Sequence, residues 1–318
     1  MSGQAFDASA VRASLLPLDL AAAHPLDAAT RAYLAHYNIE FDTEFTGLDH
    51  RIGTLDAVGE RIVVHVLRPV EPRGTAFVLH GYFDHTGLYG HLLRYCLQKQ
   101  LQVVTFDQPG HGLSSGAPAT IDDFNRYVDA FNTVRAHVES SAPRPWHLLG
   151  QSMGGAVAME HLLSAGHMAR DVPYRNIVLF APLVRPYQWR LLRLVFYTLG
   201  PFIKEWPRGI GGNSADETFN TFLRESDPLQ AKSVMVAWVS AMAKWQRRFA
   251  KRTPSDLAPI VIQGGADKTV DAAYDLQVIA RLFRPIVHHL PTAQHHLVNE
   301  MPALRAEMFA LVDGSWRA

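Results

Sequence analysis

The chain contains little cysteine and no excess of charge of either sign. Only one of its 318 residues, Cys96, is a cysteine, so an internal disulfide is excluded. Cys96 lies in LLRYCLQK, whose pattern predicts the buried side of a helix. Basic and acidic residues balance at 30 each, which offers no general attraction to nucleic acid. We therefore expect neither a disulfide scaffold nor a nucleic-acid-binding protein.

Long hydrophobic runs are also missing. No stretch reaches the roughly 20 apolar residues that cross a bilayer. The leucines between positions 15 and 20 are interrupted by Pro17 and Asp19, which is not the pattern of a signal peptide. We expect a cytoplasmic protein, and peripheral contact with the inner face of the membrane stays open.

The histidines are numerous but are not spaced as metal ligands. None of the sixteen lies in a paired pattern such as H-E-x-x-H, the spacing that places two ligands on one helix face. We therefore expect neither a metal nor a cofactor.

Apolar runs alternating with helical patterns make up most of the chain. Residues 41–69 predict two antiparallel strands. The runs that predict the further strands are 75–79, 101–106, 146–149, 177–180, 260–264 and 285–290. The patterns that predict helices are 25–37, 88–99, 121–138, the segment after Ser152, 272–282 and 302–312. Strands that alternate with helices form a mostly parallel sheet covered on both faces, and ligands bind at the carboxyl ends of its strands.

This alternation stops between residues 184 and 255. The segment is too long for a loop and holds four of the six tryptophans. It predicts a helical cap inserted into the α/β core, so the chain divides into 1–183, 184–255 and 256–318. We expect one helix at Trp189–Leu199, a second begun by a capping box of Ser214 and Glu217, and a third starting at Asp227-Pro228.

The predicted helix Trp189–Leu199 is apolar on nearly every face, so something must cover it. It can pack against the rest of the insert. It can also belong to a lid whose inner face lines an acyl-chain pocket and whose outer edge touches lipid. The two interpretations are compatible.

The central motif is the run WHLLGQSMGGAVAMEHLL, residues 146–163. It contains Gly150-Gln151-Ser152-Met153-Gly154, a Gly-x-Ser-x-Gly placed between a predicted strand and a predicted helix. This arrangement holds a serine hydroxyl exposed on a tight turn, where it can act as a nucleophile. By itself the motif can also be a structural turn. Its context favours a catalytic Ser152.

A serine nucleophile needs a histidine base and a carboxylate that orients the histidine, which follow it along the chain in the order acid, histidine. Asp267 lies just beyond a predicted strand and is preferred over Asp271 and Asp275, which fall in or near the next helix. Four histidines are candidates for the base: His288, His289, His295 and His296. The first two fall within a strand, and the residues alone do not separate His295 from His296.

The tetrahedral intermediate needs two hydrogen-bond donors for its oxyanion. We expect these to be the backbone N–H groups of Met153 and Tyr82, the latter in the loop after the predicted strand 75–79. His80 is expected to be a buried structural residue. Asp107 and His111 are expected to brace the glycine-rich loop at 107–116.

Four motifs together resemble the monoacylglycerol lipase and lysophospholipase branch of the serine α/β-hydrolases. They are LHGYFDHTGLY, FDQPGHGLSSG, GQSMGG, and GGADKTVD with AQHHLVNE. The resemblance implies the α/β-hydrolase fold with a helical cap, and His295 as the base. Gln151 departs from the histidine common in that family, and Tyr82-Phe83-Asp84 replaces smaller residues, which affects the acyl pocket.

This resemblance implies a cofactor-free serine hydrolase that cleaves one fatty-acyl ester of a monoacylglycerol or lysophospholipid through an acyl-enzyme. The partner is then a small lipid or ester substrate, with membrane contact through the cap as an additional option. A short-chain carboxylesterase, a thioesterase or a serine aminopeptidase on the same site is the alternative. A catalytically inactive binding module is a third interpretation, which the presence of Ser152, Asp267 and His295 disfavours.

Overall fold

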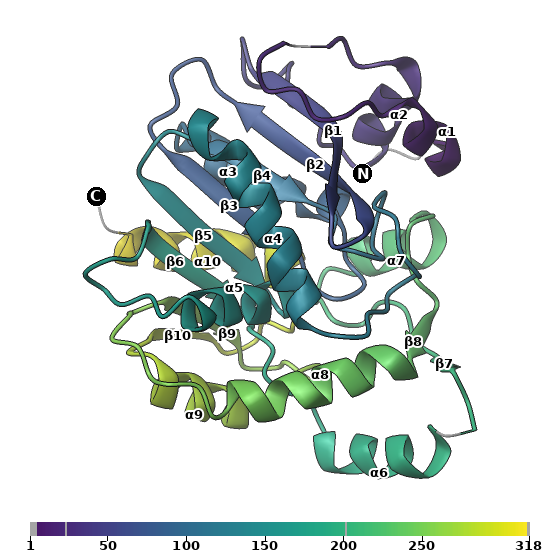
Figure 1. Cartoon of the computed structure of the whole chain (residues 1–318), viewed down its shortest axis with the longest axis vertical. Coiled ribbons are helices and arrows are strands. Elements are labelled where there is room, and N and C mark those ends of the chain that lie inside the picture. Colours follow the sequence, from purple (N-terminus) through teal and green to yellow (C-terminus); the bar gives the residue numbers. More distant parts are fainter. Residues whose placement is uncertain (1–4, 23, 201, 317–318) are drawn as a thin grey trace.

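An eight-stranded sheet runs through the molecule (Figure 1). The computed structural model describes residues 5–22, 24–200 and 202–316. The strand order is β1-β2-β4-β3-β5-β6-β9-β10, in which β1, β2 and β4 pair antiparallel and all other neighbours pair parallel. The strands are β1 (Asp49–Ala57), β2 (Glu60–Arg68), β3 (Thr75–Leu79), β4 (Gln102–Phe106), β5 (Trp146–Gln151), β6 (Tyr174–Phe180), β9 (Ile260–Gly264) and β10 (Ile286–Leu290).

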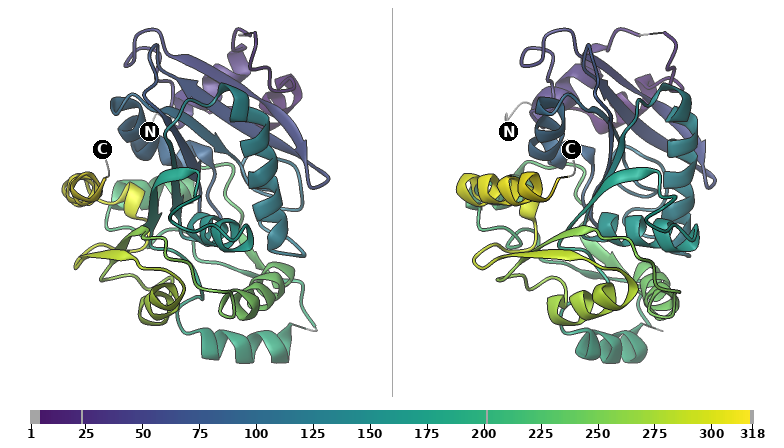
Figure 2. Two further views of the ribbon diagram at one scale, coloured as in Figure 1. Left: turned by 60° about the vertical axis from the view of Figure 1, so that its left-hand side comes forward. Right: turned by 90° about the vertical axis from the view of Figure 1, so that its left-hand side faces the viewer.

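Helices cover both faces of the sheet. The helices of the core are α1 (Ala8–Ser14), α2 (Ala28–His36), α3 (Gly90–Gln98), α4 (Asn125–Val138), α5 (Met153–Ser164), α9 (Ala272–Leu282) and α10 (Pro302–Ser315). Figure 2 shows α3 and α10 on one side of the sheet and α4 and α5 on the other. Every residue of β3, β4, β5 and β9 is buried, which explains why these strands read as continuous apolar runs. The α/β fold with a mostly parallel sheet is confirmed.

Most predicted elements are present with shifted ends. The first strand begins at Asp49, because residues 42–47 form turns instead. The helix predicted from Ile121 begins at Asn125. The helix predicted over 25–37 is α2, whose first turn is capped by the Asp27 side chain. Cys96 is buried on α3, as expected.

Between β6 and β9 the chain forms a separate group of elements, here called the β6–β9 insert. It contains α6 (Trp189–Leu199), β7 (Glu205–Pro207), α7 (Glu217–Glu225), β8 (Ser233–Met235) and α8 (Val236–Phe249). The short strands β7 and β8 pair antiparallel with each other.

Two of the helix starts predicted for the insert were wrong. The cap of α7 is Asp216, whose side chain accepts hydrogen bonds from the N–H groups of Thr218 and Phe219. Ser214 instead donates its hydroxyl proton to the carbonyl of Asn299. The long helix starts at Val236, nine residues after Asp227, because the residues between them include a strand that pairs with β7.

Helix α8 fastens the insert to the core. The ring of Trp245 stacks on Phe124 at a centroid distance of 4.4 Å, and its indole N–H donates to Glu160 of α5 at 3.2 Å. Trp238 stacks on Tyr82 at 3.7 Å and 11°. Aromatic pairs of this kind add to the free energy gained by burial, so α8 has a fixed position above the sheet.

Helix α6 lies at the edge of the molecule, beyond α8 (Figure 1). Its first residue, Trp189, is buried, whereas Leu191 and Leu194 are 57% and 61% exposed. The expectation that this helix is covered therefore fails for its outer side, where no other described segment shields these leucines. No helix in the described part of the chain combines the length and apolar character needed to span a bilayer.

A tight glycine contact fixes the crossing of α5 over the sheet. A Cβ on Gly154 would lie 2.1 Å from the carbonyl oxygen of Leu79, and a Cβ on Gly150 would lie 2.5 Å from that of Gly154. Both distances are shorter than the 3.0 Å below which Cβ atoms are essentially never found. The atoms in the way belong to the backbone, which cannot move aside easily. The absence of a side chain at both positions therefore permits the close approach of β5 and α5.

A buried ion pair joins the insert to the core. His85 Nε2 lies 3.1 Å from Asp227 Oδ2, and both side chains are fully buried. Tyr37 and Gln230 also donate hydrogen bonds to the Asp227 carboxylate. Burial alone would lower the pKa of His85, but Asp227, together with Asp107 and Asp84, raises the pKa above its ordinary value. Burial would likewise raise the pKa of Asp227, and His85 instead holds it below its ordinary value.

We predict that Asp227→Asn lowers the free energy of unfolding by about 3 kcal/mol at pH 6, because it leaves a buried charge unpaired. The ion pair contributes above the depressed pKa of Asp227 and is lost as pH rises through the raised pKa of His85. The difference between wild type and variant should therefore shrink at pH 9. Urea unfolding at pH 6 and pH 9 measures the difference in free energy of unfolding between wild type and variant. The same difference at both pH values would contradict the ion pair.

We further predict that Gly154→Ala destabilises the protein by about 2 kcal/mol, because the added methyl group overlaps the Leu79 carbonyl. Gly314→Ala is the matched control: Gly314 is also helical, and a Cβ there meets nothing within 4 Å. That variant should be neutral or stabilising by about 1 kcal/mol. Equal effects of the two substitutions in urea unfolding would refute the contact.

Candidate active site

Ser152 sits on the turn between β5 and α5. Its backbone has φ 52° and ψ −115°, a combination that costs free energy in a non-glycine residue and persists only where its surroundings impose it. The imposing contacts are the hydrogen bond from the Ser152 N–H to the Phe180 carbonyl and the glycine packing of β5 against α5. The result is a hydroxyl held at the carboxyl end of a central strand.

Two other side chains extend from Ser152 in a line. His295 Nε2 lies 2.9 Å from Ser152 Oγ, and His295 Nδ1 lies 2.7 Å from Asp267 Oδ2. Asp267 follows β9, and His295 lies in the loop between β10 and α10. The structure thus brings together the three residues that the sequence analysis selected.

The Asp267 carboxylate is held by more than the histidine. The backbone N–H groups of Thr269 and Val270 donate to its Oδ1 at 2.7 and 3.2 Å. Burial would raise the pKa of Asp267, but His295 and these N–H groups together hold it below its ordinary value. The carboxylate is therefore ionised and can stabilise a positive charge on His295.

The rival acids have other partners. Asp271 binds Arg185 with an N–O distance of 2.6 Å. Asp275 accepts hydrogen bonds from the N–H groups of Val184 and Arg185, both at 3.0 Å. These two carboxylates therefore hold the beginning of the β6–β9 insert against α9.

The rival histidines also lie elsewhere. His296 Nε2 lies 3.2 Å from Asp84 Oδ2. His288 and His289 are on β10, as expected, where His288 contacts Ser315 Oγ at 2.8 Å and His289 is exposed. Of the four candidates, only His295 is hydrogen-bonded to Ser152.

The loop after β3 passes directly beside the serine. A Cβ on Gly81 would lie 3.4 Å from Ser152 Cβ and 2.7 Å from Asp84 Oδ2, so glycine permits the approach. The Gly81 N–H donates to the Tyr89 hydroxyl, which donates to Asp84. The next N–H, that of Tyr82, and the first N–H of α5, that of Met153, both belong to segments that adjoin Ser152.

The Asp84–His296 pair next to the site was not found from the sequence. Asp84 was noted only as a departure from smaller residues, and His296 as a rival base. Asp84 connects the loop that carries His295 with the loop after β3. It contacts His296, the residue after His295, and Tyr89, whose hydroxyl accepts the Gly81 N–H. His296 and Asp84 are 212 residues apart in the chain. A single sequence contains no pattern that would indicate contact between them.

His80 and Asp107 have the structural roles expected of them. The Gln108 N–H donates to His80 Nε2, and His80 Nδ1 donates to the Gly81 carbonyl. Asp107 accepts hydrogen bonds from the N–H groups of Thr86 and Leu113 at 2.7 Å. His111 contacts the carbonyl of Pro109, within the same loop.

An apolar cavity of about 230 Å³ opens from Ser152 into the β6–β9 insert. Its wall combines residues of the core and of the insert, including Leu183, Trp189, Trp206, Trp238, Val239 and Met242. Three of the four tryptophans that marked the insert in the sequence therefore line the space above the serine, whereas Trp245 packs against the core.

A second cavity, of about 490 Å³, adjoins the same histidine. We call it the polar cavity; its lining includes Arg208, Gly211, Asn213, Lys268, Gln294 and His295. Arg208 was not singled out in the sequence, because one arginine in a segment rich in glycine resembles any surface loop.

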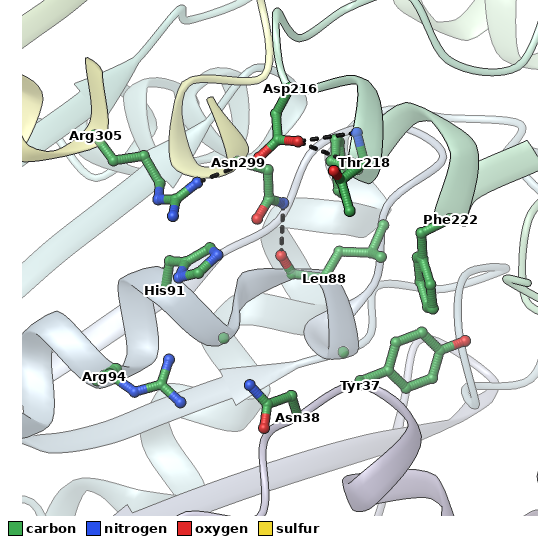
Figure 3. Close-up of a pocket in the computed structure, with 13 residues that line it drawn as sticks. Tyr37, Asn38, Leu88, His91, Arg94, Asp216, Thr218, Phe222, Asn299 and Arg305 are labelled. Carbon is green, nitrogen blue, oxygen red and sulfur yellow. Dashed lines mark hydrogen bonds and ion pairs between the residues drawn. The ribbon is translucent and has the colours of Figure 1, made fainter. Parts of the chain in front are cut away.

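A third cavity, of about 170 Å³, lies between α3, α7 and α10 and contains none of Ser152, Asp267 and His295. Figure 3 shows Arg305 and Arg94 on its wall. Arg305 lies 3.7 Å from Asp216, and Arg94 lies 2.7 Å from Glu44. Across the described residues, no group of three or more His, Cys, Asp or Glu side chains is arranged to hold a metal ion.

The chain is similar to known proteins over most of its length. The family model described as serine aminopeptidase, S33, matches residues 70–302. Human monoglyceride lipase is 28% identical over 267 residues, which cover 80% of this chain and 86% of that protein. Monoacylglycerol lipase of Mycolicibacterium smegmatis is 26% identical over 254 residues, which cover 76% of this chain and 88% of that protein.

A solved structure shares the fold. It is the soluble variant of monoglyceride lipase from Saccharomyces cerevisiae in complex with a substrate analogue, with a TM-score of 0.68 at 16% identity, over 83% of this chain and 93% of that one. The family match runs from just before β3 to the first residue of α10 and thus includes Ser152, Asp267 and His295. The chain belongs to the serine aminopeptidase S33 family of α/β-hydrolases.

Proposed function

We propose that this ester-hydrolysing enzyme cleaves a single fatty-acyl ester, that of a monoacylglycerol or lysophospholipid, through a Ser152–His295–Asp267 triad and an acyl-enzyme. The observation that carries the proposal is the continuous line from Ser152 Oγ through His295 to Asp267, with contacts of 2.9 and 2.7 Å. The names of the relatives, monoglyceride and monoacylglycerol lipases, agree with it.

In the first step His295 acts as general base. With its proton on Nδ1, where Asp267 accepts it, the Nε2 lone pair faces the Ser152 hydroxyl and can take its proton. The serine oxygen then bonds to the ester carbon. His295 returns the proton to the leaving alcohol oxygen as the ester C–O bond breaks, and Ser152 remains acylated.

In the second step water enters. His295 takes a proton from the water, the hydroxide attacks the acyl carbon, and the proton passes to Ser152 Oγ as the fatty acid leaves. Both steps place negative charge on the former carbonyl oxygen. We assign its stabilisation to the backbone N–H groups of Met153 and Tyr82, because the loop at Gly81 passes so close to Ser152.

The insert is proposed to act as a cap, with residues 184–255 as a lid between core segments 1–183 and 256–318. The apolar wall that it contributes above Ser152 suits an acyl chain. The exposed Leu191 and Leu194 on α6 suit peripheral contact with a lipid surface.

The same triad can serve a short-chain carboxylesterase, a thioesterase or a serine aminopeptidase, the last being the description of the family model. Three tryptophans on the cavity wall favour a long apolar acyl group over these alternatives. The alignment of Ser152 with His295 argues against a catalytically inactive binding module.

We predict that Ser152→Ala abolishes labelling by a fluorophosphonate probe and lowers ester hydrolysis at least about 10³-fold, because the nucleophile is removed. Gel fluorescence and a p-nitrophenyl ester assay measure the two effects. Ser114→Ala is the control, since that hydroxyl is buried in the Asp107 loop. Labelling that persists in Ser152→Ala would refute the assignment.

We also predict that kcat/KM rises with acyl length in a series of p-nitrophenyl esters, because each added methylene buries apolar surface in the cavity. Lysophosphatidylcholine and monoacylglycerol should be hydrolysed, whereas an alanine p-nitroanilide should not. Activity confined to acetate and butyrate would contradict the fatty-acyl substrate. Cleavage of the anilide would favour the aminopeptidase.

A further inference from the structure

The two cavities beside His295 differ in chemical character. The apolar cavity includes both Ser152 and His295 in its wall, whereas the polar cavity includes His295 but not Ser152. The residues that line both cavities, and so lie at the boundary between them, are Phe83, Arg208, Asn213, Thr269 and His295. A substrate whose ester bond lies at Ser152 can therefore extend one part into each cavity.

Arg208 provides a positive charge that forms no ion pair with a carboxylate among the described residues. Its guanidinium lies 3.8 Å from the Phe83 ring centroid and donates to Gln230 Oε1 at 2.9 Å. Its Nε–H is buried and has no hydrogen-bond partner among the described residues. Burial lowers the pKa of Arg208 against the opposing effect of nearby Asp84 and Asp227.

The two aspartates nearest to this charge are already bound. Asp84 interacts with His296 and Tyr89, and Asp227 interacts with His85. Neither forms an ion pair with Arg208 in the part of the chain that the structure describes. An anion that reached Arg208 from the polar cavity would therefore meet a guanidinium that has no ion-pair partner among the described residues.

The rest of the polar cavity also suits an anion. Lys268 lies on its wall, is exposed, and takes part in none of the ion pairs among the described residues. No Asp or Glu within those residues lines the cavity. The cavity between α3 and α7 is different, because its two arginines are paired with Asp216 and Glu44.

The direction of proton transfer identifies the part of the substrate that enters here. His295 must deliver its proton to the leaving oxygen, so the leaving alcohol lies on the His295 side while the acyl chain lies in the apolar cavity. A guanidinium with a free N–H is the side chain best suited to bind phosphate.

We infer that the polar cavity binds the phosphate of a glycerophosphate leaving group through Arg208 and Lys268, so that the preferred substrate is an anionic lysophospholipid rather than a neutral monoacylglycerol. This inference rests on the proposed function. In the acylation step the carbonyl carbon exchanges its bond to the glycerol oxygen for one to Ser152 Oγ. The proton of Ser152 passes through His295 to that oxygen, and glycerol phosphate leaves.

The test compares 1-octanoylglycerol with 1-octanoylglycerol 3-phosphate, both monomeric and identical in acyl chain. The quantity measured is the ratio of kcat/KM for the phosphate ester to that for the neutral ester. We expect a wild-type ratio of at least about ten, since a hydrogen bond to a charged group contributes more than one between neutral groups. Arg208→Met should lower the ratio about tenfold, mainly through KM, and Arg208→Lys by less.

Two further variants separate binding from folding. Lys268→Ala, at an exposed position, should lower the ratio about threefold. Arg170→Ala is the matched control, because its side chain is 84% exposed on the α5–β6 connection and lines neither cavity; its ratio should equal that of wild type. Glycerol 3-phosphate should inhibit competitively, and inorganic phosphate far more weakly.

The outcomes are distinguishable. A wild-type ratio near one, or equal losses on both esters in Arg208→Met, would overturn the anionic headgroup and leave the ester hydrolase intact. Equal inhibition by inorganic phosphate and glycerol 3-phosphate would also overturn it, because it would indicate a general anion site. Absence of Ser152-dependent hydrolysis of both esters would refute the proposed function itself.

Discussion

The 2.9 Å contact between Ser152 Oγ and His295 Nε2 joins residues that are 143 positions apart in the chain. It requires that the turn after β5 project the serine and that the loop after β10 return the histidine to the same edge of the sheet. Parallel pairing of β5, β6, β9 and β10 meets this requirement, because it brings their carboxyl ends together. The strained backbone of Ser152 is the cost of that projection, and the close packing of glycines on either side sustains it.

The sheet and the three site residues could be predicted because their signals are local. Gly150 and Gly154 flank Ser152 within five residues, and each buried strand is a continuous apolar run. Asp267 was favoured over Asp271 by its place just after a strand, a local criterion that the contacts of both residues match. His295 was separated from His296 by family resemblance, since neighbouring residues share the same local pattern.

What the sequence could not provide depends on contacts between distant segments. Asp227 resembles a helix start, yet it is the buried partner of His85. No periodicity in the sequence indicates an ion pair between residues 142 positions apart. Ser214 with Glu217 resembles a capping box, but the Ser214 hydroxyl donates to the carbonyl of Asn299, 85 residues away, and Asp216 supplies the cap. The exposure of Leu191 on α6 depends on where the whole insert rests. In each case tertiary packing overrides a local preference.

The insert and the core together give the space around Ser152 two chemically different sides. Tryptophans from the insert line the apolar cavity, whereas Arg208 and Lys268 line the polar one. Because His295 borders both, the same residue that activates Ser152 lies where a leaving group would receive its proton. The fold thus connects the position of one histidine to both the chemistry and the orientation of an amphipathic substrate.

The most direct test of this account is a double-mutant cycle on the Ser152–His295 contact, with kcat of ester hydrolysis as the measurement and His296→Ala as the neighbouring comparison. Groups that act as one unit are strongly non-additive. The account predicts that His295→Ala is nearly as inactive as Ser152→Ala, that the double variant is no worse than either, and that His296→Ala retains more activity. Additive losses, or greater inactivation by His296→Ala than by His295→Ala, would contradict it.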